Sequence, residues 1–266
     1  MKIVLLTGSH PRHFYVANKL LQTGHIVGHL IEQREVFVPQ PPNGLLVVDR
    51  ENFIRHFKER DESEHRFFKE YATLNHDVNT LNVSREQLNS AETIDWIQSF
   101  DADLLISYGV HKLSDKLLEK APKHAWNIHG GLSPWYRGNT TLFWPFYFLK
   151  PNWAGMTIHR LTAQLDGGGI VHHSVPQLAY GDGVHDVANK AVMQVAEDLK
   201  KIITEINLED IQYVPQKSAG KLFTSSDWQP QHLRVVYNLF DNDIVDQYLD
   251  GNLPRVEPSL VNVFAK

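Results

Sequence analysis

The sequence predicts an α/β fold, with a doubly wound and mostly parallel Rossmann-like sheet followed by a small C-terminal appendage. The chain opens with a strand–helix–strand unit, because apolar runs at 2–8 and 25–33 flank a helical pattern. Apolar runs and helical patterns then continue to alternate as far as residue 206. The 266 residues provide enough chain for one or two domains with a substantial core.

The first helix is expected between residues 9 and 24. Its apolar residues recur at helical spacing, Ser9 or His10 can cap it, Pro11 suits its first turn, and Gly24 suits its end. A Pro-rich break follows at 34–44.

The next elements follow from the same patterns. Helices are expected at 51–74, 85–100, 114–121, 140–150 and 186–206, and strands at 101–109, 125–130, 155–161 and 170–178. Ser114 is a candidate helix cap. The helix at 186–206 has the most regular apolar spacing.

The chain changes character after residue 206. We expect residues 1–206 to form the main domain and residues 207–266 a helical appendage, with short helices at 230–240 and 241–251. Asp241 is a candidate cap and Gly251 a candidate stop for the second of these helices. Its apolar residues either pack on the main domain or pair two subunits as a homodimer: Ile244, Val245, Tyr248 and Leu249.

Composition excludes several classes of protein. The chain has no cysteine, so disulfides, thiolate metal sites and Cys nucleophiles are excluded, and a reducing, cytoplasmic location is expected. The net charge of −5 disfavours binding to nucleic acid. The longest apolar run, at 142–149, is too short to cross a membrane, and the N-terminus resembles a first strand more than a signal peptide.

Two polar residues close one predicted strand. Asn127 and His129 are two residues apart, so they face the same side of the strand, and Gly130 and Gly131 allow a sharp turn behind them. Open α/β sheets bind ligands beyond the carboxyl ends of their strands. The pair therefore either forms part of a site or caps the next turn.

A third polar residue favours a site. Asp166 precedes three glycines and the next strand, so its carboxylate can point into a cleft or simply close a tight turn. Near His129 it would hold the imidazole, raise its pKa and order a water molecule. Together, Asn127 can donate to an oxyanion, His129 can act as base or cationic stabiliser, and Asp166 can orient it.

These residues lie in a longer set of motifs. Asn-Ile-His at 127–129, LSPWYRG at 132–138, GMTIH at 155–159 and Asp-Gly-Gly-Gly-Ile at 166–170 occur in this order, with 37 residues from His129 to Asp166. Residues 1–180 resemble the formyltransferases that use 10-formyltetrahydrofolate, a family that formylates glycinamide ribonucleotide, methionyl-tRNA or nucleotide sugars.

The resemblance implies that Asn127, His129 and Asp166 form the catalytic triad, and that an acceptor amine attacks the formyl carbon. Asn127 and protonated His129 would stabilise the oxyanion, and Asp166 would assist removal of the amine proton. It also implies folate binding mainly through backbone groups, which by position are those of Ser107, Tyr108, Gly109, Val110, His111, Gln164 and Leu165.

The acceptor is harder to predict. The first βα turn has only Gly8 where glycinamide ribonucleotide enzymes have a Gly-rich phosphate loop, although Arg12 could pair with a phosphate. Residues 207–266 hold five Lys or Arg against eight Asp or Glu, which disfavours tRNA. An amino sugar, carried on a nucleotide, is the expected acceptor. Its expected contacts are His10, Arg12, Tyr136, Arg137, Gly138 and Thr140.

Other functions remain open. A metal hydrolase could use His129, His159 and Asp166, but no HExxH pattern is present and no metal is expected. A 10-formyltetrahydrofolate hydrolase needs the same triad with water as acceptor. Glycinamide ribonucleotide formylation and a non-catalytic Rossmann-type binding protein are the remaining alternatives.

Overall fold

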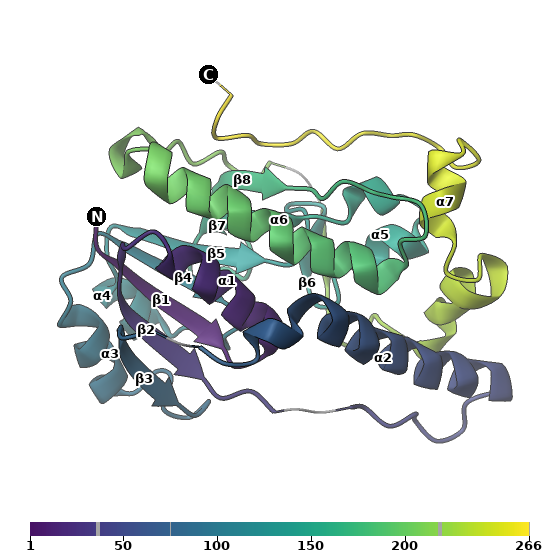
Figure 1. Ribbon diagram of the computed structural model, residues 1–266, viewed down its shortest axis with the longest axis horizontal. Coiled ribbons are helices and arrows are strands. Elements are labelled where there is room, and N and C mark those ends of the chain that lie inside the picture. The colour runs from purple at the N-terminus through teal and green to yellow at the C-terminus, as the bar shows by residue number, and fades with distance from the viewer. Residues whose placement is uncertain (36–37, 75, 218–219, 266) are drawn as a thin grey trace.

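A seven-stranded sheet forms the centre of the protein, and the computed structural model describes residues 1–35, 38–74, 76–217 and 220–265 (Figure 1). The strand order is β3-β2-β1-β4-β5-β7-β8. The strands are β1 Ile3–Gly8, β2 Ile26–Glu32, β3 Asn79–Val83, β4 Leu104–Tyr108, β5 His124–His129, β7 Met156–Arg160 and β8 Ile170–Ser174. The neighbours β3, β2, β1, β4 and β5 pair in parallel. β7 pairs antiparallel with both of its neighbours, β5 and β8. The mostly parallel sheet is therefore confirmed.

Helices cover both faces of this sheet. On one face lie α1 Pro11–Leu21 and α6 Val184–Glu205, and on the other α3 Ala91–Gln98 and α4 Asp115–Lys120. The helix α2 Val47–Phe68 packs against α1 and α6 and extends beyond the sheet (Figure 1). The side chains of β1 alternate accordingly: Ile3 and Leu5 enter the core under α1 and α6, and Val4 and Leu6 enter the core under α3 and α4. Burial on both faces explains the continuous apolar run of β1.

A second hydrophobic core joins the C-terminal segment to the main sheet. β6 Tyr136–Gly138 pairs with β9 Lys221–Phe223, next to α5 Trp144–Tyr147 and α7 Ile244–Leu249. Ile244, Val245 and Tyr248 are buried in this core, so the apolar face of α7 packs on the rest of the chain. The domain boundary at residue 206 stays a prediction.

Several predicted boundaries needed correction. The helix expected at 85–100 begins only at Ala91, because the Ser90 hydroxyl accepts the Thr93 N–H at 3.2 Å and caps it. The helix expected at 51–74 runs from Val47 to Phe68 and ends in a 3-10 turn. Ser114 caps α4 as predicted, since its hydroxyl accepts the Leu117 N–H at 3.2 Å.

The C-terminal helices also differ from the expectation. The segment 230–240 forms a 3-10 turn and a π-helix instead of an α-helix, and Asp243, not Asp241, precedes α7. The short helical segments are Lys69–Tyr71, Pro151–Trp153, Leu208–Asp210, Pro230–His232 and Val235–Leu239. Residues 36–37 of the predicted Pro-rich break lie outside the described residues. No helix in the described parts of the chain is long and apolar enough to cross a membrane.

Candidate active site

A cavity of about 1140 Å³ opens at the carboxyl ends of β1, β4 and β5. Residues that directly follow these strands line it, as expected for a doubly wound sheet. Asn127, His129 and Asp166 all line this cavity, so the structure brings the three predicted catalytic side chains together.

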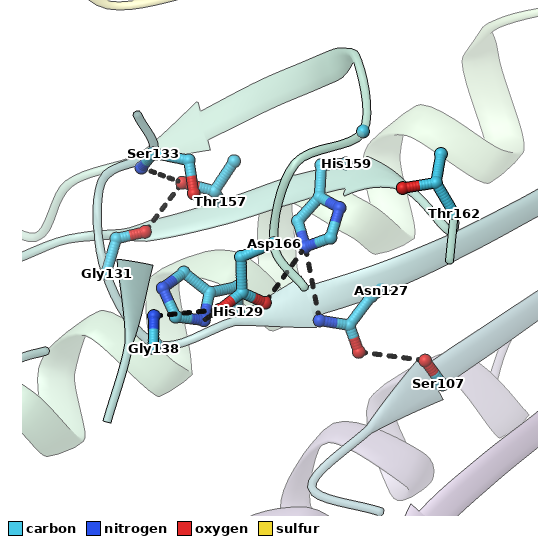
Figure 2. Close-up of polar contacts among 12 residues, drawn as sticks. Ser107, Asn127, His129, Gly131, Ser133, Gly138, Thr157, His159, Thr162 and Asp166 are labelled. Atoms are coloured by element: carbon cyan, nitrogen blue, oxygen red, sulfur yellow. Dashed lines mark hydrogen bonds and ion pairs between the residues drawn. The ribbon is translucent and has the colours of Figure 1, made fainter. Parts of the chain in front are cut away.

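Asp166 lies between the two histidines of the site (Figure 2). Its Oδ2 is 3.4 Å from His129 Nδ1, and its Oδ1 is 3.6 Å from His159 Nε2. The loop that carries it folds tightly, because a Cβ at Gly168 would lie 1.8 Å from the Arg160 carbonyl oxygen. The glycines after Asp166 therefore allow the loop to press its carboxylate against β5 and β7.

Asn127 is held from both sides. The Ser107 hydroxyl donates to Asn127 Oδ1 at 2.8 Å, which leaves the amide nitrogen as a donor on the other side (Figure 2). That nitrogen lies 3.3 Å from His159 Nε2, the residue directly opposite on β7. His159 Nδ1 donates to the Arg160 carbonyl at 2.9 Å, so Nε2 can accept from Asn127.

His129 is buried and its ring is fixed by the backbone. Nε2 donates to the Tyr136 carbonyl at 2.9 Å, and Nδ1 faces Asp166. Burial lowers the pKa of His129 below its usual 6.5, and this effect outweighs the opposing charge of Asp166. Asp166 does raise the pKa of His129, as expected, but burial favours the neutral imidazole more strongly, so the net shift is downward.

For the pKa of Asp166, the neighbouring groups outweigh the effect of burial. Burial alone would raise the pKa of its carboxyl, but His159, whose Nε2 lies 3.6 Å from Oδ1, the charge of His129 and the Gly138 N–H lower it below the usual 3.8. The Gly138 N–H donates to Oδ2 at 2.9 Å. At neutral pH the site therefore combines an ionised carboxylate with a neutral imidazole.

The turn behind His129 is braced by Thr157. The Thr157 hydroxyl donates to the Gly131 carbonyl at 2.6 Å and accepts the Ser133 N–H at 2.9 Å (Figure 2). A Cβ at Gly131 would lie 2.6 Å from the Tyr136 carbonyl oxygen, the group that holds His129. Gly131 is needed for this close approach.

Two loops form one wall of the cavity, which we call the loop wall: residues 109–113 and 162–165. Ser107, Tyr108, Gly109, Val110, His111, Gln164 and Leu165, the residues predicted to bind folate, all line the cavity there or beside it. Within the described chain, no protein group pairs with the backbone N–H groups of Val110, Lys112 and Leu113. The loop wall thus contains backbone N–H groups that no described protein group binds.

A second part of the cavity lining consists of side chains, and we call it the helix wall. It comprises His10 and Arg12 at the start of α1, His56, Arg60 and Glu64 on α2, and His185 on α6. Its charges are paired: Arg12 Nη1 binds both oxygens of Glu64, at 2.8 and 2.9 Å, and Arg60 binds Asp61 at 2.8 Å. Burial lowers the pKa of His185 to about 4, so this histidine is neutral.

The predicted acceptor contacts divide into two groups. His10, Arg12, Gly138 and Thr140 line the cavity, but Tyr136 and Arg137 are absent from its lining. The Tyr136 ring stacks on Phe223 with a centroid distance of 6.0 Å, and Arg137 Nη2 donates to the Gly220 carbonyl at 3.2 Å. Both side chains contact the packing around β6 and β9 instead of lining the cavity, so their role in acceptor binding stays a prediction.

Some site residues were missed from the sequence. His56, Arg60 and Glu64 are four residues apart, so they share one face of α2, and this spacing was a signal that could have identified the helix wall. His159 was considered only as a metal ligand, whereas it contacts Asn127 and Asp166. Among the described residues, no group of three potential ligands has the geometry to hold a metal ion.

Comparison with known proteins gives a family match. A family model described as formyl transferase matches residues 45–203. The fold is similar to a sugar N-formyltransferase from a Shewanella species, with a TM-score of 0.57, 14% identity and coverage of 91% of this chain and 90% of that one. It is also similar to the formyltransferase PseJ from Anoxybacillus kamchatkensis, with a TM-score of 0.52, 17% identity and coverage of 91% and 95%.

A third solved structure is a phosphoribosylglycinamide formyltransferase from Anaplasma phagocytophilum. Its TM-score is 0.54, its identity 16%, and the match covers 84% of this chain and 97% of that one. At these identities the likeness establishes the fold.

Proposed function

The chain belongs to the formyl transferase family, and from this premise we propose that it moves the formyl group of 10-formyltetrahydrofolate to the amine of a nucleotide-linked amino sugar. The observation that carries the proposal is the convergence of Asn127, His129 and Asp166 between the two walls of one cavity. Its volume of about 1140 Å³ exceeds that of a pocket for one drug-sized ligand, roughly 300–1,000 Å³, and suits two substrates.

The reaction begins with attack of the neutral acceptor amine on the formyl carbon. A C–N bond forms, the carbonyl electrons move to oxygen, and the amine nitrogen gains a positive charge. Asn127 stabilises the oxyanion through its amide N–H, because Ser107 holds the amide oxygen away from the reacting atoms. Contacts with Ser107 and His159 fix this donor before substrate binds, so little reorganisation is needed.

Asp166 and His129 handle the protons. Asp166 takes the proton from the amine nitrogen, directly or through water, since it stays ionised beside the Gly138 N–H. His129 is neutral in the free protein, so it stabilises the oxyanion only after it gains a proton, which Asp166 and the Tyr136 carbonyl both favour. The C–N10 bond then breaks, N10 receives a proton, and tetrahydrofolate and a formamide result.

The loop wall is the proposed site of the folate. Free N–H groups of Val110, Lys112 and Leu113 can pair with the polar edge of a pterin, and the adjoining apolar side chains can cover its faces. The PseJ structure, as a related fold, contains tetrahydrofolate together with UDP-4,6-dideoxy-4-formamido-L-AltNAc. This supports a cavity that holds a folate beside a nucleotide sugar.

The helix wall is the proposed site of the acceptor. Arg12 and Arg60 are the guanidinium groups that a diphosphate could bind by replacing Glu64 and Asp61. Neutral histidines such as His185 suit hydroxyl groups of a sugar. Because the first βα turn holds only Gly8 and offers no Gly-rich phosphate loop, a small ribonucleotide phosphate is a poorer fit than a larger nucleotide sugar.

The test is whether release of tetrahydrofolate depends on an amine acceptor. 10-Formyltetrahydrofolate is incubated with the protein and a panel of UDP- and dTDP-linked 3- and 4-amino sugars, with glycinamide ribonucleotide for comparison. We expect release only when an amino sugar is present. Equal release without any amine would identify a hydrolase, and release with glycinamide ribonucleotide alone would reject the amino-sugar acceptor.

A further inference from the structure

A buried carboxylate lies at the end of β2, outside the reaction proposed above. The Glu32 side chain has no exposed surface. Its Oε2 accepts the His111 backbone N–H at 2.7 Å, and its Oε1 accepts from Nδ1 of the same histidine. Arg34 Nη1 lies 3.6 Å from Glu32 Oε2 and 3.0 Å from His111 Nε2.

Burial of a carboxylate is costly unless hydrogen bonds and opposite charge compensate for it. Here both hydrogen bonds come from a single residue of the loop wall, His111, and Arg34 supplies the positive charge. The main consequence of these contacts is therefore that the loop after β4 is tied to the end of β2, two strands away in the sheet.

The tied loop has few other restraints. Gly109 turns it out of β4 with a φ of +70°, and Asn89 holds its far end through the Lys112 carbonyl at 3.1 Å and the Ser114 N–H at 2.7 Å. Between these points, the N–H groups of Val110 and Lys112 have no protein partner among the described residues. Glu32 fixes the residue that separates those two free groups.

We propose that Glu32 is a positioning residue for the folate cosubstrate, acting through His111 to hold the free backbone groups of the loop wall in place. The proposal rests on the proposed function, since it assigns the loop wall to folate. Glu32 touches neither the triad nor the helix wall, so it affects folate affinity and leaves the chemical step and acceptor affinity unchanged.

The test compares two charge-neutralising variants by direct binding of tetrahydrofolate and by steady-state kinetics. Glu32→Gln keeps the volume but removes the charge that binds His111 and Arg34. We expect the Kd for tetrahydrofolate to rise about tenfold, equivalent to roughly 1.4 kcal/mol, with kcat and the acceptor KM within twofold of the parent protein.

Asp49→Asn is the matched control. Asp49 is equally buried and binds Arg234 through Nε and Nη2, both at 2.6 Å, but Arg234 does not line the cavity, whereas His111, the partner of Glu32, does. We expect it to lower the melting temperature as much as Glu32→Gln does while leaving the Kd for tetrahydrofolate unchanged. A parallel rise of Kd in both variants would reduce the role of Glu32 to general stability and overturn the proposal.

His111→Ala provides a second variant if Glu32→Gln folds poorly. The side chain of His111 is 34% exposed and its backbone N–H remains bound to Glu32. We expect a three- to fivefold rise of the Kd, smaller than that of Glu32→Gln. If the parent protein binds no tetrahydrofolate, the proposed function fails. If the parent binds tetrahydrofolate and Glu32→Gln and His111→Ala both bind it as tightly as the parent does, only the positioning role of Glu32 fails.

Discussion

The two walls of the cavity offer different chemical groups to a ligand. The loop wall offers backbone N–H groups of Val110, Lys112 and Leu113, and the helix wall offers side chains such as His56 and the Arg12–Glu64 pair. Backbone groups are the same in every sequence, whereas side chains change with each substitution. Under the proposed function, the loop wall can therefore bind a ligand common to many proteins at low sequence identity, while the side chains of the helix wall would select the acceptor.

In the proposed reaction Asn127, His129 and Asp166 act on both ligands, so loss of one of them should have the largest effect. Asp166→Asn removes the proton acceptor and its charge but keeps the size of the side chain. We expect kcat to fall by roughly 10²–10⁴, with tetrahydrofolate binding and the melting temperature close to those of the parent. Steady-state rates of tetrahydrofolate release measure this effect, and a rate within fivefold of the parent would exclude Asp166 from the reaction.

A change in the backbone of the loop wall tests whether this wall determines the affinity for folate. Gly109→Ala places a Cβ 2.3 Å from His13 Nε2 at a φ of +70°. We expect a loss of about 1–3 kcal/mol in the free energy of unfolding and a weaker affinity for folate. Gly24→Ala is the control, because it has the same φ of +70° and no neighbour within 4 Å. An equal loss of stability and of folate affinity in both variants would contradict this account.

A change in the helix wall should affect only the acceptor. Arg12→Ala removes a guanidinium group that is now bound to Glu64. We expect the KM of the amino sugar to rise about three- to tenfold, as loss of one charge-assisted contact allows, with the folate KM unchanged. Arg55→Ala, which removes the Arg55–Glu59 pair on α2 outside the cavity lining, is the control. A matching rise in the folate KM would show that the walls are not separate.

The protonation state of His129 can be measured in the free protein. Histidine-selective NMR titration, with His129→Gln to assign the signal, should give a midpoint below 6.5, because burial lowers this pKa. The imidazole is then neutral above that midpoint and gains a proton as the pH falls through it. In Asp166→Asn the midpoint should fall further, since the charge of Asp166 raises it. A midpoint above 6.5 would show that Asp166 outweighs burial.

The smallest effect is expected at Tyr136. Its ring packs against Phe223 and only its carbonyl, which any residue provides, holds His129. Burial raises the pKa of the Tyr136 hydroxyl to about 12, so this group is neutral. Tyr136→Phe should change neither KM by more than twofold. A fivefold rise in the acceptor KM alone would return Tyr136 to the acceptor site.

Much of the sheet could be predicted because its central strands are buried on both faces and appear as apolar runs. β3 gave no such signal, since Asn79, Thr80 and Asn82 are exposed at the edge of the sheet. The segment 85–90 contains residues that favour helices, yet the Ser90 cap starts α3 later. The local sequence pattern predicts neither the edge strand β3 nor the start of α3, because pairing with the sheet decides the first and the Ser90 cap decides the second.

The site, too, could be predicted only where a side chain identifies the residue. Asn127 and His129 were predicted because they lie at the end of a strand, and Asp166 because it lies in a Gly-rich loop between two strands, where side-chain identity carries the signal. The Tyr136 carbonyl that fixes His129 has no side-chain signal, and the lowered pKa of His129 depends on burial that only the folded chain creates. The helix wall requires α2 to lie beside α6, a contact between residues far apart in the sequence.

The fate of the formyl carbon tests the whole proposal. 10-Formyltetrahydrofolate carrying ¹³C in the formyl group is incubated with the protein and the nucleotide-linked amino sugars, and the products are followed by ¹³C NMR. The label should appear as a formamide on the sugar nitrogen, and Asp166→Asn should abolish that signal. Label that appears only as formate, at a rate independent of the amino sugar, would contradict formyl transfer to an amine.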